Sequence, residues 1–125
     1  MKRKASSADS PASDEPYCRA VVSAGQVFSS GVLGIDPATG IAPDSVAAQA
    51  EQALINLTDL LSESGSSMQR LVKVTIYFVS TEDFAAINEV YARHMPADPP
   101  ARSVVPCSAL PEGLLFCIDA VATLD

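Results

Sequence analysis

The chain has 125 residues, of which 48% are hydrophobic, and this suits one compact domain with its own core. Its formal net charge is -7 and its pI is about 4.5. Because polyanions are held mainly by Lys and Arg contacts to phosphates, this charge argues against nucleic acid as the main partner. No apolar stretch is long enough to cross a membrane, so no membrane partner is expected.

The N-terminal segment, residues 1–13, has a basic start followed by Ala, Ser, Asp and Pro. It lacks the apolar core of a secretory signal, and Asp9 is unfavourable in a transit peptide. The sequence predicts a partly disordered segment here, with little strand character in residues 2–6, and a single domain over residues 14–125. The odd number of cysteines, without a CxxC pair, favours a reducing compartment. The expected location is the cytoplasm, with the mitochondrion as the alternative for a eukaryotic source.

Residues 17–22 and 26–30 are expected to form two short strands around a Gly-containing turn, which suggests a hairpin. The turn formers in residues 34–40 then predict a loop.

Two helices are predicted from apolar residues that recur with the 3.6-residue period. Asp44 or Ser45 caps the first helix, which ends at Gly65. The second begins near residues 80–81 and ends before Pro96. The apolar positions expected to face the core are Val46, Ala50, Ala53, Leu57, Leu60 and Leu61 on the first helix and Phe84, Ile87, Val90 and Tyr91 on the second.

Three further segments are expected to be extended. Residues 72–79 form a strand, and residues 103–108 form another in which Pro106 suggests a sheet edge or a bulge. A turn at residues 110–113 precedes the last strand, residues 114–123. The positions expected on the helix-covered face are Val72, Val74, Ile76, Phe78, Leu114, Phe116, Ile118 and Ala120.

These elements predict an α/β two-layer fold, a mixed sheet with two helices on one face. The other sheet face then carries half-apolar side chains and has no cover, which predicts an oligomer. The residues expected there are Tyr77, Val79, Leu115 and Val121. Neither a metal site nor a His-based triad is expected, since His94 is the single histidine and the cysteines lack zinc-ligand spacing.

Several blocks of the sequence, in order, resemble the RidA family of enamine and imine deaminases. They are Pro-Tyr-Cys-Arg-Ala-Val at 16–21, Phe-Ser-Ser-Gly at 28–31, Asp-Pro-Ala-Thr-Gly at 36–40, Asp-Phe-Ala-Ala-Ile-Asn-Glu-Val-Tyr at 83–91, Pro-Ala-Arg-Ser at 100–103, Leu-Pro at 110–111 and Ile-Asp-Ala-Val-Ala at 118–122. The resemblance implies a chorismate-mutase-like domain that forms a homotrimer with active sites between subunits. It also implies cofactor-free hydrolysis of 2-iminopropanoate, 2-iminobutanoate and their enamine tautomers to 2-keto acids and ammonia.

Five side-chain or backbone positions of the active site follow from this resemblance. Arg102 is expected to hold the substrate carboxylate, because a guanidinium fork matches a carboxylate in a bidentate pair. Tyr17 is expected to hydrogen-bond the substrate or the attacking water. Ser30 and Gly31 are expected to bind substrate, since glycine lets a ligand approach the backbone. Asn88 matches the helical asparagine of the family.

The water-binding part of the site departs from the family pattern. The resemblance assigns a main-chain carbonyl of this strand to holding the water, at the position of Val104. Cys107 is the alternative, through its backbone, but is interpreted as a packing residue. Many deaminating members carry a Glu six residues after the proline of the Leu-Pro pair, and this chain has Cys117 there. Asp119 matches the second acidic position of the family. A thiol replaces a carboxylate in such a role only when its pKa is lowered, so Cys117 leaves the substrate and the rate open.

Three alternatives therefore stand beside the imine deaminase. One is a related hydrolase with a different substrate. Another is a trimer that binds small carboxylates without catalysis. The third is the endoribonuclease or translation-inhibitor role attached to some family names, which the negative net charge disfavours.

Overall fold

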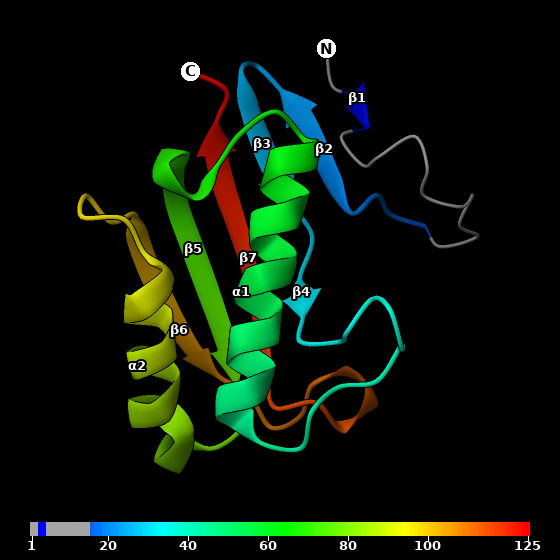
Figure 1. Cartoon of the computed structure of the whole chain (residues 1–125), viewed down its shortest axis with the longest axis vertical. Coiled ribbons are helices and arrows are strands. Elements are labelled where there is room, and N and C mark those ends of the chain that lie inside the picture. The colour runs from blue at the N-terminus through cyan, green and yellow to red at the C-terminus, as the bar shows by residue number, and fades with distance from the viewer. Residues whose placement is uncertain (1–2, 5–15) are drawn as a thin grey trace.

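The computed structural model describes residues 3–4 and 16–125 (Figure 1). The elements are β1 (Arg3–Lys4), β2 (Ala20–Ser23), β3 (Gln26–Ser29), β4 (Val32–Leu33), α1 (Val46–Glu63), β5 (Leu71–Phe78), α2 (Phe84–His94), β6 (Ala101–Pro106) and β7 (Phe116–Thr123). The strands form one sheet in the order β1-β2-β3-β7-β5-β6, and β4 also pairs with β7. The β5–β6 pair is parallel and the other pairs are antiparallel, so the sheet is mixed as predicted.

Both helices cover the same face of this sheet (Figure 1), which confirms the two-layer α/β architecture. The core lies between the layers. It is built from the apolar stripe of α1, from Ile87 and Val90 on α2, and from alternate residues of β5 and β7. Burial alternates strictly along β7, as the apolar pattern predicted, although the strand begins at Phe116 and not at residue 114. No helix in the described part of the chain is long and apolar enough to span a membrane.

The structure differs from the prediction for the N-terminal segment at two residues. Arg3 and Lys4 pair with Val22 and Val21 of β2, although little strand character was expected there. Backbone pairing to an exposed sheet edge depends little on side-chain type, which explains why the local pattern carried no signal. The remainder of the predicted disordered segment, residues 1–2 and 5–13, lies outside the described residues.

The assignment of Val72 to the helix-covered face is wrong. Its side chain is 43% exposed, whereas Leu71 and Val74 are buried. The β5–β7 register shifts between Leu71 and Lys73, and a bulge of this kind reverses the side-chain alternation on one strand. The prediction for Pro106 is confirmed, because it ends β6, the outer strand beside β5.

Helix α1 begins where the capping signal predicted. The Ser45 hydroxyl accepts a hydrogen bond from the Ala48 N–H at 3.1 Å. Gln49 was not among the positions expected to face the core, and it is buried. Its amide donates to the Pro43 carbonyl at 2.9 Å and accepts from the Leu115 N–H at 2.8 Å, so it ties two loops to the helix.

Candidate active site

Arg102, on the outer strand β6, is held by one hydrogen bond and two ring contacts to α2. Its Nη1 donates to Asn88 Oδ1 at 2.8 Å. Its guanidinium carbon lies 4.8 Å from the centre of the Tyr91 ring and 5.8 Å from that of Phe84, both on α2. Arg102 and Asn88, predicted separately, therefore form one unit at the β6–α2 edge.

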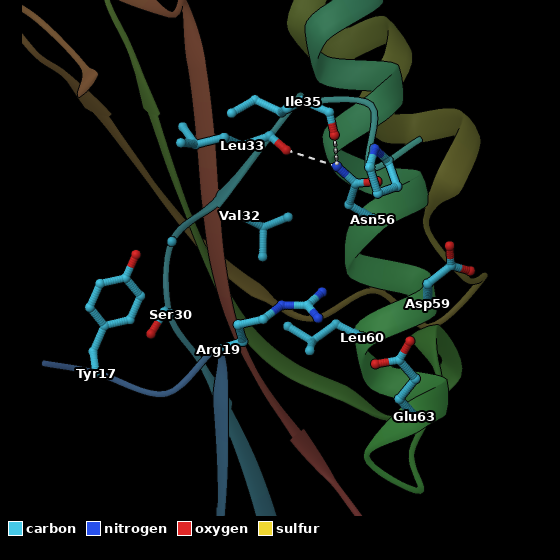
Figure 2. Close-up of a pocket in the computed structure, with 12 residues that line it drawn as sticks. Tyr17, Arg19, Ser30, Val32, Leu33, Ile35, Asn56, Asp59, Leu60 and Glu63 are labelled. Atoms are coloured by element: carbon cyan, nitrogen blue, oxygen red, sulfur yellow. Dashed lines mark hydrogen bonds between the residues drawn. The ribbon is translucent and has the colours of Figure 1, made fainter. Parts of the chain in front are cut away.

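A second group of predicted residues lies at the β4 side of the sheet. Tyr17, Ser30 and Gly31 line a hollow of about 430 Å³ between this edge and α1 (Figure 2). The Ser30 hydroxyl donates to the Cys18 carbonyl at 2.6 Å, which anchors the entry to β2. A Cβ atom on residue 31 would lie 2.8 Å from Cys117 Sγ, so glycine leaves room for the thiol.

The strand order separates these two groups. Leu33 on β4 pairs with Cys117, which pairs with Tyr77, which pairs with Val105 on β6. Three strand spacings of about 4.8 Å place the two edges on the order of 14 Å apart. A small substrate therefore does not contact Arg102 and Gly31 of the same chain together.

The carbonyl of Val104 is turned to the free edge of β6. Cys107, just beyond β6, donates its N–H to the Phe78 carbonyl of β5 at 2.7 Å. In a parallel ladder, alternate residues turn their N–H and C=O groups to the neighbouring strand, so Val105 shares this direction and Val104 points away from β5. This orientation leaves the Val104 carbonyl able to accept from a water, while its side chain packs against the core.

The Cys117 thiol is not prepared for acid–base work. Burial, and then the charge of Asp119, raise its pKa from the ordinary 9.0 to about 11. The thiol is neutral at physiological pH and does not replace a carboxylate as a base. Its place beside Gly31 suits a wall of the site.

We expect the alkylation rate of Cys117 by iodoacetamide to rise through pH about 11, because the thiolate is the reactive form. Because the pKa of this thiol is higher in the folded chain, its contribution to the free energy of unfolding is complete below pH 9. This contribution declines as the pH rises through 11. Peptide mass spectrometry at a series of pH values measures the rate for each cysteine. A midpoint below pH 9 for Cys117 would contradict the assignment.

A hydrogen bond between Tyr77 and Asp119 was not predicted. The Tyr77 hydroxyl donates to Asp119 Oδ2 at 3.0 Å, across neighbouring strands on the sheet face away from the helices. This hydrogen bond, together with some burial, raises the pKa of Tyr77. The alternation of both strands put the two residues on one face, but their register could be read only from the strand pairing.

The residues of α1 that form one wall of the hollow were also not predicted as site residues. Asn56, Asp59, Leu60 and Glu63 line it, opposite the strand-side residues (Figure 2). The signal was a polar stripe at positions 56, 59 and 63, whose spacing of three and four residues places them on one helix face. Arg19 lines the same hollow and was not among the predicted site residues.

Asn56 ties β4 and its following loop to α1, and we expect Asn56→Ala to destabilise the fold by about 1–3 kcal/mol. Its amide nitrogen donates to the carbonyls of Leu33 at 3.0 Å and Ile35 at 2.8 Å, and both would lose their partner. Urea unfolding measures the change. Gln52→Ala is the control, since it removes one helix-surface hydrogen bond to Asn56 and should cost about 0.5 kcal/mol or less. Equal losses in both variants would contradict the tethering role.

Among residues 3–4 and 16–125, no group of three or more His, Cys, Asp or Glu side chains is placed to hold a metal ion. His94 joins the helices instead, with its Nε2 2.6 Å from Glu51 Oε2. The three cysteines are free thiols.

A two-layer α/β domain with an arginine stacked at one sheet edge and a hollow near the other is an arrangement that suits a small ligand. Comparisons with known proteins agree. The model of the family described as endoribonuclease L-PSP matches residues 7–124. Reactive Intermediate Deaminase A, chloroplastic, of Arabidopsis thaliana is 40% identical over 124 residues, which cover 98% of this chain and 66% of that protein.

Two further relatives extend the comparison. The 2-iminobutanoate/2-iminopropanoate deaminase of Capra hircus is 37% identical over 123 residues, covering 98% of this chain and 90% of that protein. The crystal structure of RidA from a Psychrobacter species has a TM-score of 0.89 at 31% identity, covering 97% of this chain and 98% of that one. The chain therefore belongs to the endoribonuclease L-PSP family, which includes the RidA proteins that its motifs resemble.

Proposed function

We propose that this chain is a deaminase that hydrolyses 2-imino acids and their enamine tautomers, with 2-iminopropanoate and 2-iminobutanoate as substrates. The observation that best supports this proposal is the position of Arg102, which is held by Asn88 and by the rings of α2 before any ligand binds. Relatives of this chain in plants and mammals are named for this activity.

The reaction needs a held carboxylate, a placed water and a leaving ammonia. We assign the carboxylate to the Arg102 fork, which pairs with two oxygens at once. Water adds to the imine carbon, and the C=N double bond becomes a single bond to nitrogen. The C–N bond then breaks, the water's protons pass to the departing nitrogen, and 2-keto acid and ammonia are formed. The Val104 carbonyl orients the water by accepting a hydrogen bond from one of its O–H groups.

We further propose that a complete site is built from two copies in a homotrimer. The Arg102 group and the Gly31 group lie at separate edges of one chain, so a neighbouring copy has to supply the second edge. The sheet face away from the helices supports self-association, because Phe28 and Val105 are 41% and 38% exposed on it. Each copy then contributes one edge to each of two sites.

The test is a coupled assay. A serine or threonine dehydratase generates the imine in a buffer that contains semicarbazide, and semicarbazone formation is followed with and without the protein. Suppression of semicarbazone by the wild-type chain, lost in Arg102→Ala, supports the function. Unchanged semicarbazone formation with a folded, assembled protein would refute it.

A second candidate is a trimer that binds small carboxylates without catalysis. The neutral Cys117 thiol favours it, since the position of the family's Glu then holds no base. Binding of 2-ketobutyrate by calorimetry without suppression of semicarbazone would identify this function. The endoribonuclease role is disfavoured by the net charge of -7. We propose the cytoplasm as the compartment, because the three cysteines are free thiols.

A further inference from the structure

The residues that hold Arg102 form a stripe on α2. Phe84, Asn88 and Tyr91 are spaced four and three residues apart, which places them on one face of the helix. All three contact the Arg102 side chain, which reaches them from β6. The hydrogen bond to Asn88 limits the rotation of the guanidinium in its own plane. A ring contact limits the tilt of that plane, so the two kinds of contact are complementary.

Tyr91 differs from an ordinary tyrosine in the use of its hydroxyl. The residue is 7% exposed, and its hydroxyl is buried with no hydrogen-bond partner among the described residues. Buried tyrosine hydroxyls usually have a partner, so this one adds no favourable contact. Burial raises the pKa of Tyr91, and the Arg102 charge opposes this, so the ring carries no charge at physiological pH. The useful part of Tyr91 at this place is its aromatic ring.

We propose that Tyr91, supported by Phe84, is a positioning residue for the deamination reaction and holds the Arg102 guanidinium ready for the substrate carboxylate. This inference rests on the proposed function. The ring contributes by cation–π attraction, with its centre 4.8 Å from the guanidinium carbon. An arginine ordered in advance loses less conformational entropy when the carboxylate binds.

The test compares Tyr91→Leu with Tyr91→Phe. Tyr91→Leu removes the ring, and we expect KM for the imino acid to rise roughly 2- to 30-fold, the range of a cation–π contact. The value of kcat should stay within about twofold, since the carboxylate is held alike in the ground and transition states. Tyr91→Phe keeps the ring and should retain the wild-type KM. An unchanged KM in folded Tyr91→Leu overturns the proposal, and so does an equal rise in Tyr91→Phe.

Two variants separate positioning from general damage to the fold. Val90→Ala removes volume from the same helix at a residue that is 3% exposed, and it should lower stability without a change in KM. A KM increase in Val90→Ala as large as that in Tyr91→Leu would reduce Tyr91 to a structural role. If Tyr91→Leu does not fold, Phe84→Leu decides. Its longer distance of 5.8 Å predicts a smaller rise in KM, and no rise overturns the proposal.

A spectroscopic measurement makes the proposal independent of catalysis. Stacking on a ring face should shift the Arg102 side-chain N–H resonance upfield in the wild type and in Tyr91→Phe, and this shift should diminish in Tyr91→Leu. An identical resonance in Tyr91→Leu overturns the positioning role, whatever the activity of the wild type. Absence of imine hydrolysis by the wild type would instead refute the proposed function.

Discussion

Arg102→Ala is expected to lower kcat/KM for 2-imino acids by roughly 30- to 1000-fold, because a carboxylate loses a charged bidentate partner worth about 2–4 kcal/mol. Arg102→Lys should recover only a small part of this loss. Lysine keeps the charge but lacks the planar fork, and it makes a poorer contact with the Tyr91 ring. The coupled semicarbazide assay gives both values.

Arg93→Ala is the matched control, since it removes an equal charge from α2. The Arg93 side chain is 61% exposed and lies 3.6 Å from Glu51, away from the Arg102 contacts. Its kcat/KM should stay within about twofold of the wild type, because exposed ion pairs contribute little. A loss in Arg93→Ala similar to that in Arg102→Ala would mean that net charge, and not the fork, is responsible.

Mixing two inactive variants is expected to restore activity. The Arg102→Ala variant still has an intact Tyr17, and the Tyr17→Ala variant still has an intact Arg102. A mixed assembly therefore contains interfaces at which one copy supplies Arg102 and its neighbour supplies Tyr17. Random assembly of an equal mixture in a cyclic trimer makes about one quarter of the interfaces complete. The variants are unfolded together, refolded together, and assayed beside each variant refolded alone.

The outcome depends on where the site is completed. If Arg102 and Tyr17 acted within one chain, no subunit in the mixture would carry both, and activity would stay at the level of the separate variants. The strand order, with β4 and β6 on the two sides of the β7–β5 pair, argues for completion between copies. Size-exclusion chromatography of the mixture confirms that a failure to recover activity is not a failure to assemble.

Much of the fold could be predicted from local patterns. The apolar period of residues 46–61 predicted the buried face of α1, and the alternation of residues 116–123 predicted the two faces of β7. Pro106 marked a sheet edge because a residue without an N–H cannot occupy an inner strand. Each of these signals lies within one segment and reports how that segment meets water or the core.

The features that the sequence patterns did not predict lie where two segments far apart in the chain meet. Val72 turns outward because β5 bulges against β7, and Gln49 is buried because two loops close over it. Strand β4 is only two residues long and carries no period of its own. Arg3 and Lys4 pair through their backbone, which side-chain patterns do not encode.

The candidate site, like the fold, has features that one segment predicts and features that depend on contacts between segments. The sequence by itself predicted which residues belong to the candidate site, because motifs preserve residue type and local spacing, and Arg102, Asn88, Ser30 and Gly31 all lie in such blocks. Only the tertiary structure decided which of them meet. It joined Arg102 to Asn88 and Tyr91, placed Gly31 against Cys117, and separated the two groups across the sheet. The physical reason is that strand order and register depend on contacts between segments far apart in the chain, which no single segment specifies.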